Sequence, residues 1–297
     1  MRPLIVGIAG DSGTGKTTFV RELACLLGED QTTLVDLDGY HTLDRQQRRA
    51  LGITPLDPRA NDLPRIAEHA RALRSGQPVD VPTYDHTTGT FGPTRRVEPR
   101  PFVILEGLLP FHLPEACAAF DVRIYFDTHP EVKLKWKIDR DVAERGHRLE
   151  DVMEEIIRRL EDFRRYVDPQ KVHADLLVSY VPAQLNGNGR NPWRQPWVWV
   201  AERAERSFLT ERVAEEGRRW GVRAFPYDCL GVAFAALEIR DGMSGGQCAA
   251  LLEACGVDAP LVRRARASGH LSAAQVAQFL VAWRLEHERA VVVRGGR

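Results

Sequence analysis

The sequence has no excess of charge of either sign and no long apolar run. Its 297 residues hold 41 Lys and Arg against 41 Asp and Glu, so no net field draws the chain to nucleic acid or to an anionic membrane. No apolar run approaches the roughly 18 residues of a membrane helix, and the N-terminus has no signal-peptide pattern. We therefore expect a cytoplasmic protein without nucleic-acid or membrane partners.

Cysteine is also scarce, and no C-x-x-C pair occurs. The five cysteines are scattered along the chain: Cys25, Cys117, Cys229, Cys248 and Cys255. An odd, scattered set argues against a disulfide framework and against a zinc site, so we expect reduced thiols. The length and a hydrophobic content of 43% allow one large α/β domain or two modest ones.

The most informative stretch is Gly10-Asp-Ser-Gly-Thr-Gly-Lys-Thr17. It matches the phosphate-binding loop pattern G-x-x-x-x-G-K-[S/T]. It lies between an apolar strand and a segment whose apolar residues recur at the spacing of a helix. Its glycines let the backbone approach phosphate oxygens, and the helix that follows presents free N–H groups to them. Lys16 supplies a cation for the outer phosphates, and the Thr17 hydroxyl can ligate Mg²⁺. The predicted ATP-binding residues are Gly10, Asp11, Ser12, Gly13, Thr14, Gly15, Lys16, Thr17 and Thr18.

Two further apolar strands end near acids. Asp38 follows the strand expected over 32–37, and Glu106 lies at the end of the strand over 100–107. Ligands of open α/β sheets bind at the carboxyl ends of the strands. Asp38 is therefore a candidate proton acceptor, and Thr17, Glu106 and Asp38 are candidate Mg²⁺ ligands. The alternative at both strand ends is an ordinary acidic turn.

Another apolar strand, 120–127, precedes two charged helices that we expect over 130–145 and 150–166. The first carries Lys137, Arg140 and Arg145, and Gly146 is expected to end it. Such a helix is either a solvated surface element or a cationic lid that closes over the triphosphate. Most arginines of the second helix are expected at the surface.

Strands that alternate with helical stretches predict the fold class. We expect an α/β fold of the P-loop NTPase type, with a doubly wound, mostly parallel sheet flanked by helices. Beyond about residue 183 the composition of the sequence changes, with a loop rich in Asn, Gly and Pro over 184–196. Residues 244–289 have the pattern of two or three helices. We therefore predict a kinase-type domain over 1–240 and a small helical C-terminal extension over 241–297.

Several segments together resemble the phosphoribulokinase/uridine kinase family, most closely its plant and cyanobacterial phosphoribulokinases. They run in the family's order from about residue 4 to residue 180, and they are 10–17, 37–45, 56–62, 82–89, 104–108, 136–147 and 167–171. Many phosphate-loop proteins share the first segment. The Tyr-His…Asp-Arg element after Asp38 and the Arg-Asp…Glu-Arg-Gly-His element after Ile138 are far more specific.

The resemblance implies an ATP- and Mg²⁺-dependent kinase that acts on a pentose phosphate, such as ribulose 5-phosphate. It implies that Asp38 is the general base, that Lys16 serves catalysis and that Asp141 is a further acid important to the reaction. The implied substrate-binding residues are His41, Arg45, Tyr84, His86 and Lys137. Arg140 and Arg145 are implied on the side of the ATP. We keep a homodimer as a hypothesis.

Three positions depart from the plant-type pattern of the family. Thr14 and Asp36 occupy the places of its redox cysteines, so thiol switching through that pair is not expected. Gly39 occupies the place of a second acid. We weigh two alternatives to the sugar-phosphate kinase, namely a uridine/cytidine kinase and a non-catalytic ATP-binding regulatory protein.

Overall fold

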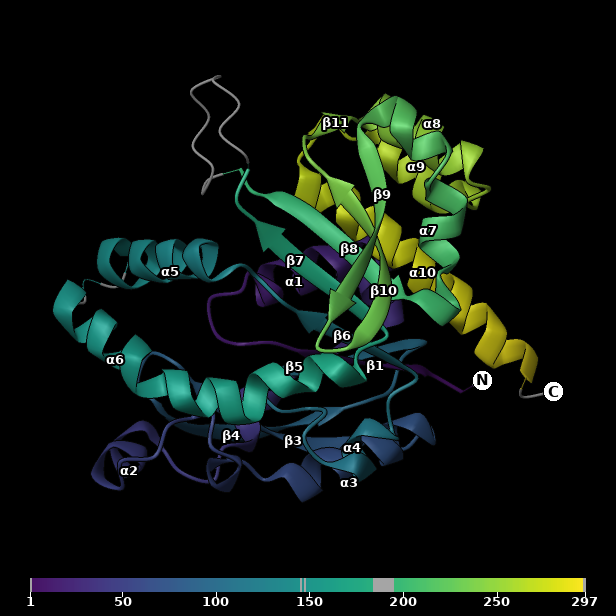
Figure 1. Ribbon diagram of the computed structural model, residues 1–297. Coiled ribbons are helices and arrows are strands. Elements are labelled where there is room, and N and C mark those ends of the chain that lie inside the picture. Colours follow the sequence, from purple (N-terminus) through teal and green to yellow (C-terminus); the bar gives the residue numbers. More distant parts are fainter. Residues whose placement is uncertain (1, 145, 147, 184–194, 296–297) are drawn as a thin grey trace.

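The computed structural model describes residues 2–144, 146, 148–183 and 195–295, and these are built around one eight-stranded sheet (Figure 1). In spatial order its strands are β2 (Thr32–Asp36), β5 (Phe102–Gly107), β1 (Leu4–Ala9), β6 (Val122–Phe126), β7 (Leu176–Val181), β8 (Trp197–Arg203), β10 (Val232–Ile239) and β9 (Val222–Cys229). The first five run parallel, and the last three are added antiparallel. The doubly wound, mostly parallel sheet expected from the sequence is confirmed.

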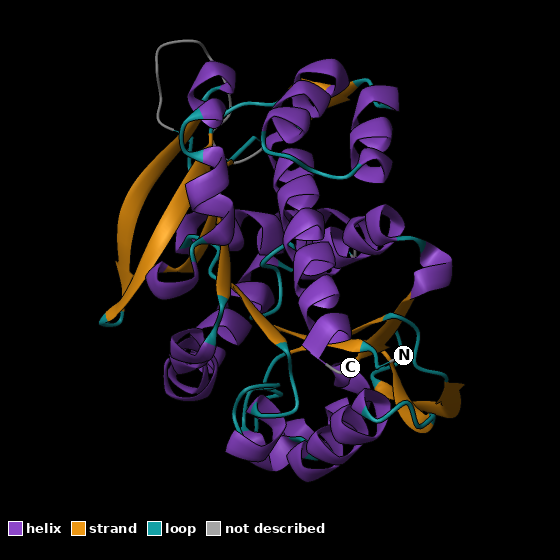
Figure 2. Ribbon diagram, turned by 90° about the vertical axis from the view of Figure 1, so that its right-hand side faces the viewer, coloured by secondary structure: helices purple, strands orange, loops and turns teal. Residues whose placement is uncertain are grey.

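Helices cover both faces of the sheet, as Figure 2 shows. The helices are α1 (Lys16–Leu27), α2 (Arg45–Ala50), α3 (Leu63–Arg74), α4 (Pro114–Cys117), α5 (Pro130–Ile138), α6 (Leu149–Asp162), α7 (Phe208–Val213), α8 (Gly245–Ala254), α9 (Ala259–Ala267) and α10 (Ala273–Gly295). Two small hairpins complete the fold, β3 (Val79–Asp85) with β4 (Thr90–Val97), and β11 (Met243–Ser244) with β12 (His270–Leu271). None of the helices in this described part of the chain has the length and apolar character of a membrane span.

Alternation along β1 explains why the sheet has two cores. Leu4, Val6 and Ile8 point into a cluster that they share with α1 and α10, whereas Ile5 and Ala9 point into a cluster with α3. Successive strand residues face opposite sides, and every residue of β1 is buried, as in a central parallel strand.

The C-terminal helices belong to the first of these cores. Leu280 and Trp283 of α10 lie in the same cluster as Leu23 of α1. Figure 1 shows α8, α9 and α10 on the side of the molecule opposite α5 and α6. The division of the chain at residue 240 stays a prediction, and α10 packs directly against the phosphate-loop helix.

The charged helix expected over 130–145 is shorter than its pattern indicated. The α-helix ends at Ile138, and a π-helical turn follows over Asp139–Glu144. This turn brings the carboxylate of Asp141 against both Lys137 and Arg140. The second charged helix likewise ends early, at Asp162, and continues as a π-helical turn over Phe163–Val167. Such turns are frequent at functional sites.

Candidate active site

The glycine-rich loop connects β1 to α1 at the carboxyl edge of the parallel strands. Gly13 and Gly15 have φ angles of 81° and 82°, in the left-handed region that favours glycine. A Cβ atom on Gly15 would also lie only 3.0 Å from the ring of Trp136. Because Gly15 is the N-cap of α1, no side chain of its own satisfies the first N–H groups of the helix. The loop has the geometry of an anion-binding helix N-terminus.

Lys16 and Thr17 both contact the carboxylate of Glu106. Lys16 Nζ lies 3.0 Å from Glu106 Oε2, and the Thr17 hydroxyl donates to the same oxygen at 3.2 Å. Burial acts to lower the pKa of Lys16, but the negative charges of Glu106 and Asp38 outweigh it and raise this pKa above its usual value. The Lys16 ammonium therefore stays charged beside the loop, where the outer phosphates of a nucleotide would lie.

The oxygen donors beside the loop fit a magnesium ion. Mg²⁺ prefers hard oxygen ligands, and it takes most of them from phosphates and water when only one or two side chains bind it. The Thr17 hydroxyl and the Glu106 carboxylate supply two such oxygens. Within the described ranges, no three acidic, His or Cys side chains gather closely enough to hold a metal by themselves. This donor set suits an ion that a triphosphate brings with it, and a metal role for Asp38 stays a prediction.

Asp38 lies in a short 3-10 turn directly after β2. Its N–H donates to Asp36 Oδ1 at 2.9 Å, which fixes the start of the turn. A Cβ atom on Gly39 would lie 2.1 Å from the carbonyl oxygen of Pro82 in β3. Strand β3 therefore packs directly on this turn, and only glycine fits at residue 39. This close approach leaves no room for the second acid of the plant-type pattern.

The hairpin of β3 and β4 carries His86 to Asp38. His86 Nε2 lies 3.5 Å from Asp38 Oδ2, and Arg45 at the start of α2 donates to the carbonyl oxygen of His86. The Arg45 N–H also donates to the carbonyl oxygen of Gly89 at 2.9 Å. The structure thus brings His86 to Asp38 and Arg45, which lie more than forty residues earlier in the sequence.

His41 and Tyr84 form a wall beside this group, in which His41 is buried and Tyr84 is half-buried. Their rings meet edge to face with centroids 5.2 Å apart. The Asn61 side chain holds His41 Nδ1 at 2.9 Å, and Arg48 donates to the Tyr84 hydroxyl at 2.8 Å. Burial lowers the pKa of His41 although Asp38 acts in the opposite direction, so this imidazole is neutral at pH 7. Arg48 and Asn61, which support this wall, were not predicted from the sequence.

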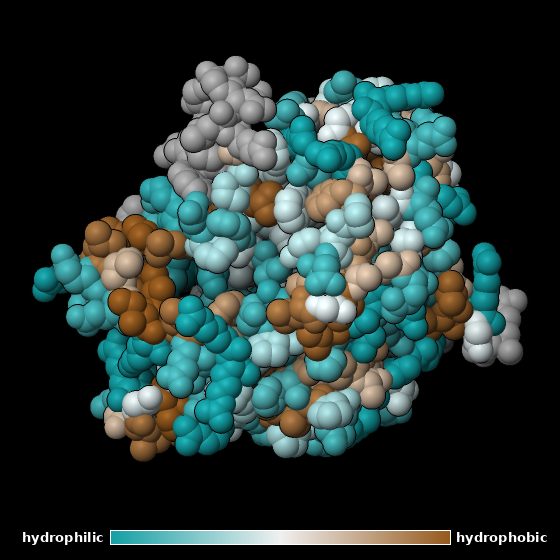
Figure 3. Space-filling view, in the orientation of Figure 1, coloured by the Kyte–Doolittle hydropathy of each residue, from teal (hydrophilic) through white to brown (hydrophobic). Residues whose placement is uncertain are grey.

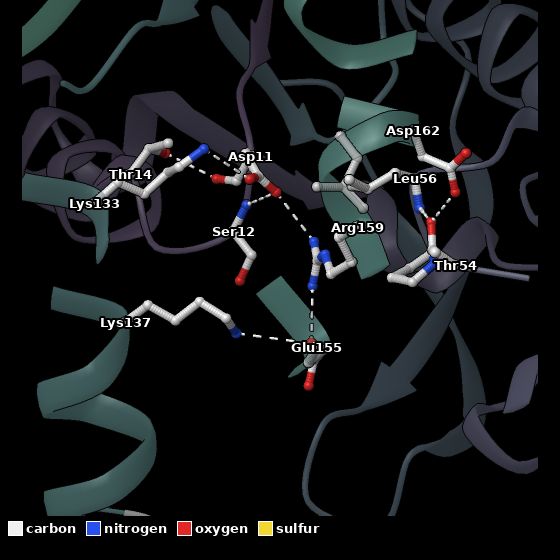
Figure 4. A network of polar contacts seen from close by, with 12 residues as sticks. Asp11, Ser12, Thr14, Thr54, Leu56, Lys133, Lys137, Glu155, Arg159 and Asp162 are labelled. Carbon is white, nitrogen blue, oxygen red and sulfur yellow. Dashed lines mark hydrogen bonds and ion pairs between the residues drawn. The ribbon is translucent and has the colours of Figure 1, made fainter. Parts of the chain in front are cut away.

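A chain of ion pairs connects the loop to α5 and α6, as Figure 4 shows. Asp11 receives Lys133 Nζ on one carboxylate oxygen and Arg159 Nη2 on the other, each at 3.0 Å. Arg159 also contacts Glu155 at 3.2 Å. Burial opposes ionisation of Asp11, but the charges of Arg159 and Lys133 lower its pKa below the usual value. At the far end of α6, the Thr54 hydroxyl donates to Asp162 at 2.6 Å.

Arg159 was missed because the arginines of its helix were expected at the surface. It is buried, and it lies two turns after the buried Val152 on the same face of α6. This spacing of seven residues is the signal that could have placed Arg159 on the inner face.

Lys137 lies above the phosphate loop. Its Cβ is 3.6 Å from the point where a Cβ of Gly13 would be, and its Nζ lies 2.8 Å from Asp141 Oδ2. Arg140 Nε contacts the other oxygen of Asp141 at 2.9 Å. Burial opposes ionisation, but Arg140 and Lys137 lower the pKa of Asp141 to about 2. Arg145 lies outside the described residues.

The remaining loop residues lie around the phosphate position. The Ser12 N–H donates to Asp11 Oδ1 at 2.7 Å. Thr14 is buried, its hydroxyl donates to the Asp11 carbonyl at 2.9 Å, and its own carbonyl accepts from Thr128 at 2.8 Å. Thr18 is exposed on the first turn of α1. These contacts fix the shape of the loop.

Residues 5–186 match the model of the phosphoribulokinase/uridine kinase family. The chain belongs to this family. A phosphoribulokinase of Synechocystis sp. is 46% identical over 184 residues, which cover 62% of this chain and 55% of the relative. A uridine kinase of Chloroflexus aggregans is 33% identical over 196 residues, which cover 64% of this chain and 90% of the relative. The chain spans about half the length of the curated phosphoribulokinases that it matches.

A solved phosphoribulokinase structure from Rhodobacter spheroides shares the fold. It superposes with a TM-score of 0.56 at 18% sequence identity, covering 79% of this chain and 90% of that chain. At this identity the superposition supports the architecture of the sheet and its helices. The assignment of the site residues depends on the distances and hydrogen bonds in this chain.

Asp36 gives this family member a titrating group beside the proposed base. The surrounding protein atoms and the charge of Asp38 raise the pKa of Asp36 from 3.8 to about 6. Because the folded chain holds this proton more tightly than the unfolded chain, the stability contribution of Asp36 falls as the pH rises from about 4 to about 6. Asn at this position keeps the oxygen that accepts the Asp38 N–H but does not titrate.

We therefore expect the Asp36→Asn variant to melt about 2 °C above the unmodified protein at pH 7.5 and close to it at pH 4. This shift corresponds to about 1 kcal/mol in a chain of this size, after allowance for solvent screening at an exposed residue. Thermal melts at the two pH values measure the difference, with Asp30→Asn as an exposed control. Equal differences at both pH values would contradict the assignment.

Proposed function

We propose that this protein transfers the γ-phosphoryl group of ATP to a hydroxyl of a pentose phosphate. The leading reaction is the conversion of ribulose 5-phosphate to ribulose 1,5-bisphosphate. The observation that carries the proposal is the placement of the Asp38–His86–Arg45 group beside the phosphate loop. Asp38 is close enough to Lys16 of this loop for its negative charge to raise the pKa of Lys16. The proposal also draws on the 46% identity to a phosphoribulokinase.

The chemistry follows from this arrangement. Asp38 accepts the proton of the acceptor hydroxyl as its oxygen attacks the γ-phosphorus, and the bond from this phosphorus to the β–γ bridging oxygen breaks to leave ADP. Lys16 neutralises charge on the outer phosphate oxygens during the transfer. Magnesium, held beside Thr17 and Glu106, would supply further charge neutralisation. Positioning and electrostatics account for most of the catalysis in such a transfer.

We assign Arg45 as the cationic partner of the acceptor phosphate. Arg45 offers a planar pair of donors that suits a phosphate, and His86 stands between Arg45 and the base. We assign His41 and Tyr84 to the sugar side of the site because their rings pack together beside Asp38. Lys137 and Arg140 approach from the nucleotide side, where α5 lies over the loop.

A uridine/cytidine kinase is the second candidate function. The match to a uridine kinase over 90% of that relative favours it, and Tyr84 with Phe91 at a centroid distance of 5.9 Å supplies aromatic surface near the acceptor side. A nucleoside lacks the phosphate that Arg45 suits, which places this candidate second.

Substrate turnover tests the two candidates together. Purified protein is assayed for ADP release with ATP, Mg²⁺ and ribulose 5-phosphate, and in parallel with uridine and cytidine. We expect turnover with the pentose phosphate and little with either nucleoside. Turnover with a nucleoside alone would replace the leading proposal. ATP binding without turnover of any of the three would support the non-catalytic regulatory protein.

A further inference from the structure

Helix α6 contacts two loops that lie on different sides of the site. Its Arg159 is paired with Asp11 of the phosphate loop at 3.0 Å. Three residues later, Asp162 accepts a hydrogen bond from the hydroxyl of Thr54 at 2.6 Å. Figure 4 shows both contacts. Residues three apart are neighbours on the surface of a helix, so one end of α6 is joined to both loops.

The second loop leads from Thr54 to the acceptor side of the site. We call residues 54–61 the acceptor-side loop. At its start the Thr54 hydroxyl accepts the N–H of Leu56 at 3.1 Å, and both residues are buried. At its end the amide nitrogen of Asn61 donates to two carbonyl oxygens of the same loop at 3.0 and 2.9 Å. The amide oxygen of Asn61 accepts from His41 Nδ1 at 2.9 Å, which ties the loop to the wall of the acceptor site.

Apolar packing contributes little to the position of α6. Within this helix, all of which the structure describes, only Val152 and Arg159 are buried. Figure 3 shows apolar residues gathered over the region of α5 and α6. The outer face of α6 exposes large apolar side chains, namely Leu149, Ile157 and Leu160. The polar contacts to Asp11 and Thr54 therefore have a large share in fixing where the helix lies.

We propose that the end of α6 is a strut between the two substrates, and that Thr54 and Asp162 are positioning residues for phosphoryl transfer. This inference rests on the proposed function. The attacking oxygen must lie about 3–3.5 Å from the γ-phosphorus and in line with the leaving oxygen, and a misplacement of about 1 Å can lower the rate ~10²-fold. The Arg159–Asp11 pair anchors the strut on the ATP side, and the Thr54–Asp162 hydrogen bond anchors it on the acceptor side.

Steady-state kinetics of Thr54→Val test the strut, because valine keeps the shape of threonine without its hydroxyl. We expect kcat to fall at least ~10-fold, while the KM values for ATP and ribulose 5-phosphate stay within about threefold of those of the unmodified protein. Thr54→Ser keeps the hydroxyl and should retain most of kcat. Asp162→Ala should lower kcat as Thr54→Val does, and the double variant should lower it no further, because both changes remove the same hydrogen bond.

The matched control is Thr33→Val at the opposite end of the sheet. Thr33 is buried, and its hydroxyl also makes two bonds, donating to the carbonyl oxygen of Glu98 at 2.8 Å and accepting the N–H of Arg100 at 3.2 Å. This variant should lose a similar amount of thermal stability but keep kcat within about twofold. Unchanged kcat in Thr54→Val, an equal loss in Thr33→Val, or a raised acceptor KM in place of a lowered kcat would overturn the strut.

Hydrogen exchange separates failure of the strut from failure of the proposed function. If the unmodified protein turns over no acceptor, the proposed function fails, and exchange with and without a non-hydrolysable ATP analogue tests the strut. We expect the analogue to slow exchange over 10–17 and, through α6, at least ~5-fold over 54–61. In Thr54→Val only residues 10–17 should respond. Slowing over 54–61 that persists in Thr54→Val, or no slowing there in the unmodified protein, would overturn the strut.

Discussion

Replacing Asp38 by asparagine is expected to lower turnover at least ~10²-fold while ATP binding and folding are kept. Asparagine has nearly the same shape and keeps the backbone N–H that donates to Asp36. It cannot accept a proton from the acceptor hydroxyl, and loss of general-base help costs about 10² to 10⁴ in rate. Initial rates with saturating ATP and ribulose 5-phosphate measure the loss, and calorimetric titration with an ATP analogue measures binding.

The matched control for this prediction is Asp80→Asn. Asp80 lies on β3 of the neighbouring hairpin, is 58% exposed and pairs with Arg96 at the surface. This variant should keep the rate within about twofold of the unmodified protein, because surface ion pairs contribute little. Turnover of Asp38→Asn close to that of Asp80→Asn would remove Asp38 from the role of base.

Replacing Arg284 by alanine is expected to destabilise the whole chain by about 3 kcal/mol at pH 7. Arg284 on α10 lies 2.8 Å from Glu202 on β8, and both side chains are buried. Glu202 also accepts from the N–H groups of Leu209 and Thr210. The variant leaves a buried carboxylate without its cation. We expect the melting temperature to fall by roughly 6–12 °C in a single transition.

The pH dependence of this variant identifies the cause of the loss. Burial already raises the pKa of Glu202 although Arg284 acts to lower it, and removal of Arg284 raises it further. The folded variant then binds a proton as the pH falls, so its stability deficit should shrink between pH 7 and pH 5. Arg266→Ala, which breaks an exposed pair with Glu253, is the control and should change stability by under ~1 kcal/mol.

The same melts test how the C-terminal helices relate to the sheet. If residues 241–297 folded as a separate unit, loss of Arg284 would release that unit from the sheet and give two transitions. The shared core of Leu23, Leu280 and Trp283 predicts one transition instead. The sequence could not decide this point, because an apolar helix face shows that a partner exists but not which element supplies it.

The fold and the phosphate loop were predictable because both are local in the sequence. The apolar strand before Gly10 and the helical spacing after Lys16 place the loop between β1 and α1. Asp38 and Glu106 were found because parallel strands end at the same edge of a sheet. In the structure Asp36 and Glu106 are indeed paired residues of β2 and β5.

The residues that support the site could not be predicted from the sequence, because their contacts join segments that are distant in the chain. The sequence by itself determined the loop, the strand-end acids and the family. Only the tertiary structure decided that Asp11 is the partner of Arg159, that β3 leaves room for no side chain on Gly39, and that α6 keeps an apolar face toward solvent. The identity of a charged residue or a glycine does not tell whether its position is exposed to water or packed against backbone. The elements that surround the residue in the fold decide which of the two environments it has.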